Sequence, residues 1–237
     1  MDFDLGVTQV FADGADRNGI LELRSNPVIR GFTTNPTLMR AAGVEDYESF
    51  AVDMVDLVPD RPISFEVFSN EPDGMVEQAL KISSWGEHVH VKIPVTDTLG
   101  NSTVAVQRSL AGSGVKLNVT ALLTADQVRE VAGALVDAPH AYVSVFAGRI
   151  ADTGSDPLPV MVEALEILAP YKNLELIWAS PREILNVAQA AAIGCHVITV
   201  THELLKKLPG LGRDPVEVSL DTVKMFARDA ELSGYSL

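Results

Sequence analysis

A lysine stands near the centre of an apolar, β-branched stretch, HVHVKIPVTD at residues 88–97. A buried ammonium group is costly unless it is paired or loses its proton, so we expect Lys92 to be paired, exposed or reactive. A neutral lysine amine can attack a ketone and form a Schiff base. The polar residues that accompany Lys92 must decide between these possibilities.

The side chains of a strand alternate between its two faces, and this places Lys92 beside His90 and opposite Val89, Val91 and Ile93. The same alternation in neighbouring β-branched runs separates further polar residues from apolar ones: Glu66, Asn118, Thr120 and Ser144. Each residue alone is more simply explained as a strand-end group bonded to a nearby loop. Taken together with Lys92, they favour a functional site where several strands end. The alternation would also turn Trp178 inward.

Eight β-branched runs alternate with segments of helical period, and this order predicts a parallel barrel ringed by helices, a (β/α)8 TIM barrel. We expect a single domain over residues 1–237. An open doubly wound sheet is the alternative, but no GxGxxG or Walker A motif supports it. The predicted strands cover residues 8–13, 28–34, 62–68, 89–95, 115–121, 141–146, 174–180 and 195–200.

The clearest predicted helix is TADQVREVAGAL at residues 124–135. Thr124 can cap its start, and Gln127 completes a capping box. The residues at helical spacing that form its apolar stripe are Val128, Val131, Ala132 and Leu135.

The composition is typical of a globular protein, with 47% hydrophobic and 21% charged residues. A formal net charge of -14 argues against nucleic acid or an acidic membrane as a partner. The sequence shows no apolar run of membrane-spanning length, and its first residues lack the features of a secretory signal, so we expect a cytoplasmic protein. One cysteine and five scattered histidines without ligand spacing predict no metal site.

Five segments, taken in order, resemble the signature segments of the transaldolase family, which includes the related fructose-6-phosphate aldolases. They are GFTTNPTL (31–38), VKIPVT (91–96), LNVTALLT (117–124), SVFAGRIADTG (144–154) and ASPRE (179–183). The resemblance runs from about residue 11 to residue 200. It implies a TIM barrel that needs no cofactor and acts on sugar phosphates. We also expect a homo-oligomer, although the family uses several oligomeric states.

The resemblance also implies catalytic roles. Lys92 would be the nucleophile that forms a Schiff base with a ketose phosphate, and Asp13 the acid and base for the C4 hydroxyl group. Glu66 and Thr120 would orient a water that relays protons. The alternative for Asp13 is a helix N-cap, for which it competes with Asp16.

Substrate contacts follow from the same matches. Asn35 in TTNP corresponds to the residue that holds the dihydroxyacetone unit, although Asn35-Pro36 could equally begin a helix. Further contacts to the substrate are implied for Thr33, Asn118, Ser144 and Phe146.

Two arginines are expected to bind the phosphate, Arg149 in FAGRIAD and Arg182 in ASPRE. Ser180 can cap a helix whose first residue is Pro181, and a helix N-terminus beside a guanidinium group suits a phosphate. An arginine on an exposed loop is by default only solvated, and a sulfonate-bearing sugar could use the same pair.

Three functions therefore remain open. The chain could be a transaldolase, an aldolase that releases dihydroxyacetone, or a barrel that binds sugar phosphates without catalysis. The aldolases of the family carry glutamine and tyrosine where this chain has Glu66 and Phe146, so these two positions favour the transaldolase.

Overall fold

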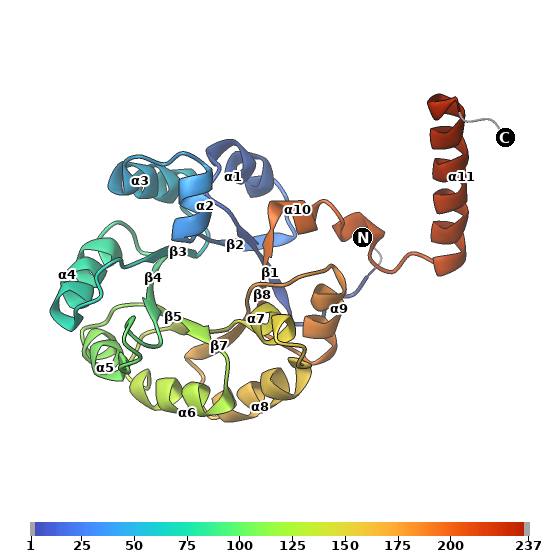
Figure 1. Cartoon of the computed structure of the whole chain (residues 1–237). Coiled ribbons are helices and arrows are strands. Elements are labelled where there is room, and N and C mark those ends of the chain that lie inside the picture. The colour runs from blue at the N-terminus through green and yellow to red at the C-terminus, as the bar shows by residue number, and fades with distance from the viewer. Residues whose placement is uncertain (1–2, 235–237) are drawn as a thin grey trace.

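The computed structural model describes residues 3–234, so the ends of the predicted domain, 1–2 and 235–237, lie outside the described residues. Eight parallel strands close into a barrel in the order β1 to β8, and helices surround it (Figure 1). This confirms the predicted (β/α)8 TIM barrel and all eight predicted strands. The strands are β1 (Gln9–Asp13), β2 (Ile29–Thr33), β3 (Ile63–Glu66), β4 (Val89–Pro94), β5 (Leu117–Leu122), β6 (Ala141–Val145), β7 (Leu174–Trp178) and β8 (Val197–Thr201).

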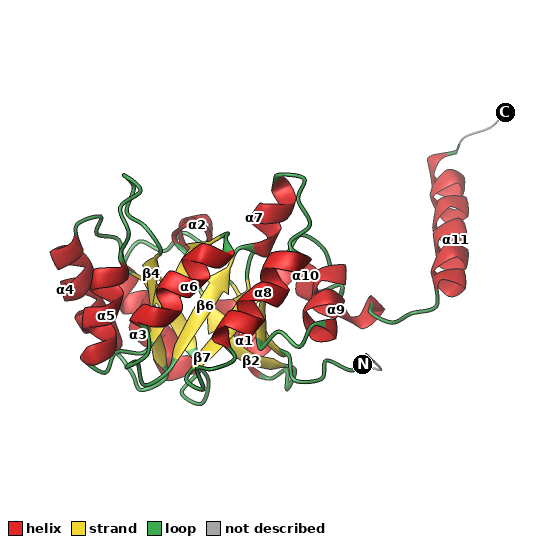
Figure 2. Ribbon diagram, turned by 90° about the horizontal axis from the view of Figure 1, so that it is seen from below, coloured by secondary structure: helices red, strands yellow, loops and turns green. Residues whose placement is uncertain are grey.

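Short helices α2 and α7 directly follow β2 and β6, and Figure 2 shows them at the same end of the barrel. Because all strands are parallel, this is the end where their carboxyl termini meet. The helices are α1 (Arg17–Arg24), α2 (Pro36–Ala41), α3 (Tyr47–Leu57), α4 (Pro72–Ser83), α5 (Val104–Gly112), α6 (Ala125–Ala134), α7 (Ala147–Asp152), α8 (Leu158–Leu168), α9 (Leu185–Ala192), α10 (His202–Leu205) and α11 (Pro215–Ser233), with a 3₁₀ turn at Leu208–Gly210.

Helix α6 forms as its sequence predicts. The Thr124 side chain accepts a hydrogen bond from the backbone N–H of Gln127, and the Gln127 side chain accepts one from the backbone N–H of Thr124. The whole predicted stripe of α6 is buried against the barrel, so amphipathic period and capping together determine where this helix lies.

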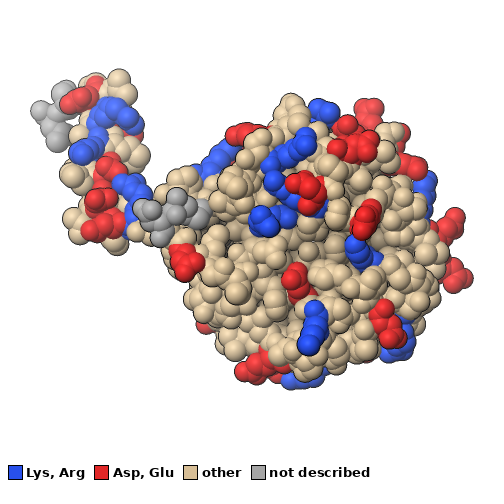
Figure 3. Space-filling model, turned by 180° about the vertical axis from the view of Figure 1, so that it is seen from behind, with Lys and Arg blue, Asp and Glu red and all other residues tan. Residues whose placement is uncertain are grey.

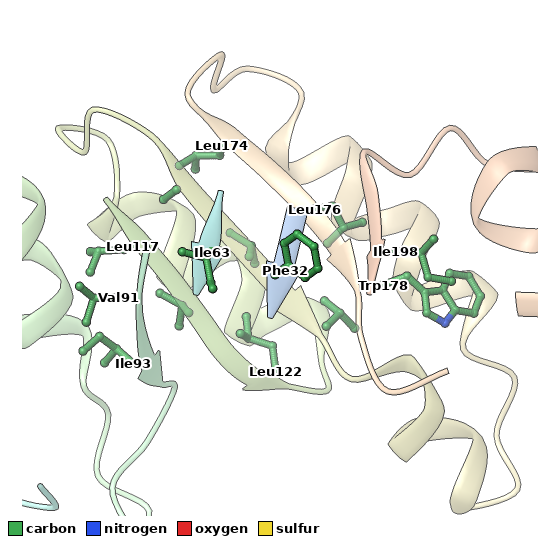
Figure 4. Packing of buried hydrophobic residues seen from close by; sticks show 14 of the residues in the cluster. Phe32, Ile63, Val91, Ile93, Leu117, Leu122, Leu174, Leu176, Trp178 and Ile198 are labelled. Carbon is green, nitrogen blue, oxygen red and sulfur yellow. The ribbon is translucent and has the colours of Figure 1, made fainter. Parts of the chain in front are cut away.

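The apolar layer between strands and helices forms the main core, and it includes Val91 and Ile93 (Figure 4). Lys92 alternates with these two residues and therefore points into the barrel. The inward orientation predicted for Trp178 is wrong. Trp178 shares the face of Leu176 and belongs to this outer layer, where it lies beside Ile198.

His90 is buried inside the barrel, towards the amino end of β4. Its Nε2 lies 2.9 Å from Nδ1 of His140, and its ring packs on Tyr142. Burial, together with the nearby His140, lowers the pKa of His90 to about 3. His90 is therefore a neutral residue of the interior that contacts other aromatic rings.

Helix α11 stands apart from the barrel (Figures 1 and 2), and none of its residues is buried. Figure 3 shows acidic and basic side chains interspersed over one face of the molecule and along α11. Within residues 3–234, no helix combines the length and apolar character that crossing a membrane requires.

Candidate active site

A cavity of about 440 Å³ opens at the carboxyl ends of the strands. All twelve residues that the sequence nominated line this cavity, although they come from seven different strands or the loops after them. They are Asp13, Thr33, Asn35, Glu66, Lys92, Asn118, Thr120, Ser144, Phe146, Arg149, Ser180 and Arg182. The structure therefore brings together every predicted site residue, while their chemical roles stay predictions.

Lys92 is buried with 7% of its surface exposed, and it is paired. Its Nζ donates a hydrogen bond of 2.7 Å to the backbone carbonyl oxygen of Thr34 and lies 3.2 Å from Oε2 of Glu66. Glu66 is the register partner of Lys92 on the neighbouring strand β3. An amine on this rigid strand, with a carboxylate in contact, can exchange its proton locally before it attacks a carbonyl carbon.

Asp13 ends β1, and its carboxylate is held from β2. Thr33 Oγ1 donates to Oδ1 of Asp13 over 2.8 Å, and Nδ2 of Asn35 lies 3.4 Å from Oδ2. Burial raises the pKa of Asp13, while Lys92 and then these hydrogen bonds act to lower it. The N-cap of α1 is Asp16, so Asp13 is free of a capping role.

Asn35 serves as the N-cap of α2, with Pro36 in the first turn. Its Oδ1 accepts a hydrogen bond from the backbone N–H of Leu38, which fixes the amide and turns Nδ2 towards Asp13. The capping interpretation is therefore confirmed, and it leaves the Asn35 amide group facing the cavity, where a substrate hydroxyl can meet it.

Asn118 is held at both ends of its amide group. Ser144 Oγ donates to Oδ1 over 2.7 Å, and Nδ2 donates to Oγ of Ser64 over 3.0 Å. These bonds connect β3, β5 and β6 across the barrel interior. Since the amide cannot turn without losing both, Asn118 presents a defined polar edge beside Lys92, its register partner on β4.

Arg149 lies in helix α7, which follows β6, and Arg182 lies in the loop after β7. Arg182 binds Asp152 of α7 through two hydrogen bonds, 2.8 Å from Nε and 2.5 Å from Nη2. Arg149 is exposed and has no ion-pair partner within residues 3–234. Since Asp152 engages one edge of the Arg182 guanidinium group, the remaining N–H donors stay available for an anion.

The predicted cap at Ser180 is wrong. Helix α9 begins at Leu185, and Ser180 has a left-handed backbone with φ of 60°. The reason is Asn186, whose side-chain oxygen accepts from the backbone N–H groups of Arg182 and Glu183 and so holds a turn before the helix. The helix N-terminus therefore begins later than expected, while Ser180 and Arg182 still line the cavity.

Gly148 allows helix α7 and the loop after β7 to approach closely. A Cβ atom at residue 148 would lie 1.6 Å from the backbone oxygen of Ser180, which no side chain could tolerate. Helix α7 and the loop after β7 are thus in direct contact, and each carries one of the two arginines.

The chain matches the sequence profile of the Transaldolase/Fructose-6-phosphate aldolase family over residues 10–234. It belongs to this family. It is 35% identical over 199 residues to a probable transaldolase of Thermoanaerobacter sp. (strain X514), with 84% of this chain and 88% of the relative covered. A probable transaldolase of Streptococcus pyogenes serotype M5 (strain Manfredo) is 35% identical over 201 residues, at the same coverage of both chains.

Solved structures with a similar fold are barrel enzymes of distant sequence. The 3-hexulose-6-phosphate synthase of Salmonella typhimurium gives a TM-score of 0.56 at 15% identity, over 82% of this chain and 89% of that one. The 4-hydroxy-tetrahydrodipicolinate synthase of Methylacidiphilum fumariolicum SolV gives 0.59 at 13% identity, over 84% and 69%. At these identities the likeness concerns the fold alone.

The transaldolase/fructose-6-phosphate aldolase match extends to residue 234, well beyond the segments recognised up to residue 200, and so includes α11. The cavity also contains residues that the sequence analysis missed, chiefly Thr199 and Thr201 of β8. Alternation in CHVITV could have identified Thr199 as inward-facing. The contact of Lys92 with Thr34 uses a backbone oxygen, for which no side-chain pattern exists.

Proposed function

We propose that this member of the family is a Schiff-base transaldolase that transfers a dihydroxyacetone unit from a ketose phosphate to an aldose phosphate. One observation carries the proposal. A buried lysine in contact with the carboxylate of Glu66 shares one cavity with a second half-buried carboxylate, Asp13. This arrangement supplies a nucleophile, a partner for its proton and a separate acid and base.

The first step joins Lys92 to the substrate. Nζ, after giving its extra proton to Glu66, attacks the C2 carbonyl of the ketose phosphate, and loss of water leaves a protonated imine. Thr120 lies in the same cavity and would help Glu66 to hold the water that carries these protons.

The second step breaks the bond between C3 and C4. Asp13 takes the proton of the C4 hydroxyl group, the C4 carbonyl forms, and the bonding electrons move to the imine to give an enamine on Lys92. The aldehyde leaves, and an acceptor aldose phosphate takes its place. The enamine then attacks the new aldehyde, Asp13 returns the proton, and hydrolysis frees Lys92. Meanwhile Asn35, Asn118 and Ser144 would hold the three-carbon unit.

The deciding experiment compares transfer with release. We expect ready transfer from fructose 6-phosphate to erythrose 4-phosphate, and only slow formation of dihydroxyacetone when the acceptor is omitted. Phe146 lines the cavity and has no hydroxyl group with which to activate a water near the enamine, so Phe146→Tyr should shift the balance towards release. Rapid release by the unmodified protein without acceptor would instead favour a fructose-6-phosphate aldolase.

We further propose that the protein forms a homo-oligomer through α11. The residues Val216, Leu220, Val223 and Phe226 lie along one side of this helix at helical spacing, and each is more than half exposed. Such a stripe is typical of a face that another chain covers.

Light scattering tests this association. The unmodified chain should have a mass above that of one subunit, and Val223→Glu should lower it. Met225→Glu places the same charge on the opposite side of α11 and should have a smaller effect. A monomeric unmodified chain would rule the proposal out.

A further inference from the structure

Two threonines from the strands on either side of β1 form a chain of hydroxyl groups that ends on Asp13. Oγ1 of Thr33 on β2 lies 2.5 Å from Oγ1 of Thr199 on β8 and donates to Oδ1 of Asp13 over 2.8 Å. Both threonines are almost fully buried, with 4% and 6% of their surface exposed. The two hydroxyl groups lie in the part of the barrel wall that faces the cavity.

The direction of these bonds follows from counting protons. A hydroxyl group has a single proton, and an ionised carboxylate can only accept. Thr33 donates its proton to Asp13, so in the short contact between Thr33 and Thr199 the hydroxyl group of Thr199 must be the donor. Each bond in such a chain polarises the next, and the effect accumulates on Oδ1 of Asp13.

The two oxygens of Asp13 therefore differ. Oδ1 accepts the end of this series of hydroxyl groups, whereas Oδ2 accepts, within residues 3–234, a single hydrogen bond, from Nδ2 of Asn35 at the long distance of 3.4 Å. A proton arriving from a substrate finds Oδ2 more accessible, because protonation at Oδ1 would force the chain to reverse.

We propose that Thr199 is a positioning residue that acts through Thr33, reserving Oδ1 of Asp13 as an acceptor and leaving Oδ2 to exchange a proton with the substrate. The inference rests on the proposed function, in which Asp13 is the acid and base. Thr199 itself touches none of the reacting atoms. It strengthens the hydrogen bond by which Thr33 lowers the pKa of Asp13, alongside the charges of Lys92 and His202, whereas burial raises this pKa.

The test is Thr199→Val, which keeps the shape of the side chain and removes the donor. Without that donor the carboxylate is less stabilised, so Asp13 takes up its proton at higher pH. The acid limb of kcat/KM against pH should move up by about 0.1 to 0.6 unit, because Thr199 acts on Asp13 only by polarising the Thr33 hydroxyl group, which changes the strength of the Thr33–Asp13 hydrogen bond by about 10–30%. At neutral pH kcat should fall while KM for the ketose phosphate changes little, and Thr199→Ser should restore the profile.

A matched control is Thr8→Val at the opposite end of the barrel. Thr8 is buried to the same degree, and its hydroxyl group donates to the backbone oxygen of Cys195, so this variant loses one buried hydrogen bond without touching Asp13. It should lose stability and keep the wild-type pH profile. In a Thr33→Val background, Thr199→Val should cause no further shift, because its route to Asp13 is already removed.

A Thr199→Val protein that binds substrate and keeps the wild-type acid limb would overturn the inference, as would a full further shift in the Thr33→Val background. If Thr199→Val fails to fold, Thr199→Ala is measured against the same expectations. Borohydride reduction of the wild-type protein with fructose 6-phosphate distinguishes failure of the proposed function from failure of the role of Thr199. If no adduct forms, the proposed function fails. If the adduct forms and the acid limb of the Thr199→Val pH profile matches that of the wild type, only the role of Thr199 fails.

Discussion

Replacing Lys92 by methionine should abolish both transfer and the covalent intermediate. Methionine fills much of the same volume but has no amine, so the route through the Schiff base is closed. We expect activity to fall by about 10⁴-fold or more, which is the order seen when a covalent nucleophile is removed. The measurement is incubation with fructose 6-phosphate, reduction with borohydride and determination of the intact mass.

The unmodified protein should gain one dihydroxyacetone-sized mass increment, and Lys92→Met should gain none. Lys116→Met is the control, because Lys116 is a half-buried lysine just before β5 that donates to the backbone oxygen of Glu87 and does not line the cavity. An adduct that persists in Lys92→Met and disappears in Lys116→Met would mean that the wrong lysine has been assigned. If neither protein nor the parent chain forms an adduct, a barrel that binds sugar phosphates without catalysis becomes the better description.

Replacing either arginine of the cavity by alanine should impair substrates that carry phosphate. A hydrogen bond to a charged group is worth about 1.5–3 kcal/mol, so Arg182→Ala should lower kcat/KM for aldose phosphates about 10- to 150-fold. Arg149→Ala should have a similar effect. Acceptors without phosphate should be affected much less, because they never contact either guanidinium group.

Arg129→Ala is the control for this comparison, since Arg129 forms exposed ion pairs with Asp126 and Glu163 and does not line the cavity. Steady-state kinetics with erythrose 4-phosphate and with unphosphorylated erythrose give the required ratio. Equal losses of kcat/KM for the two acceptors would show that the arginines do not bind the phosphate. An equal preference for a sulfonate-bearing sugar would widen the substrate class and leave the assignment of the arginines intact.

The barrel and the residues that line the cavity could be predicted from the sequence because both depend on patterns of a few residues: alternating side chains in strands and helical spacing between them. Alternation placed Lys92 opposite Val91 and Ile93, and it also predicted that polar residues on several strands would meet inside a closed barrel. Capping chemistry predicted the start of α6 at Thr124 and allowed the start of α2 at Asn35. These signals act within a few residues of one another, so one sequence is enough to read them.

The remainder depends on contacts that local patterns do not encode. Asn186 delays the start of α9 through its side chain, so Ser180 lost the capping role that its neighbour Pro181 suggested. Lys92 is paired through a backbone oxygen of a distant loop. Thr199 reaches Asp13 only because closure of the barrel brings β8 beside β1. The amphipathic period of α11 was present in the sequence, but the period alone cannot say whether the helix packs on its own barrel.

The contact between Gly148 and Ser180 has a consequence for the cost of binding. It joins helix α7 to the loop after β7, and the bond between Arg182 and Asp152 links the same two segments a second time. Ordering a flexible side chain on binding usually costs about 0.5–1.5 kcal/mol in lost rotamer freedom. Much of that loss for Arg182 has already occurred during folding, so an anion that enters this end of the barrel meets a guanidinium group whose orientation is largely settled in advance.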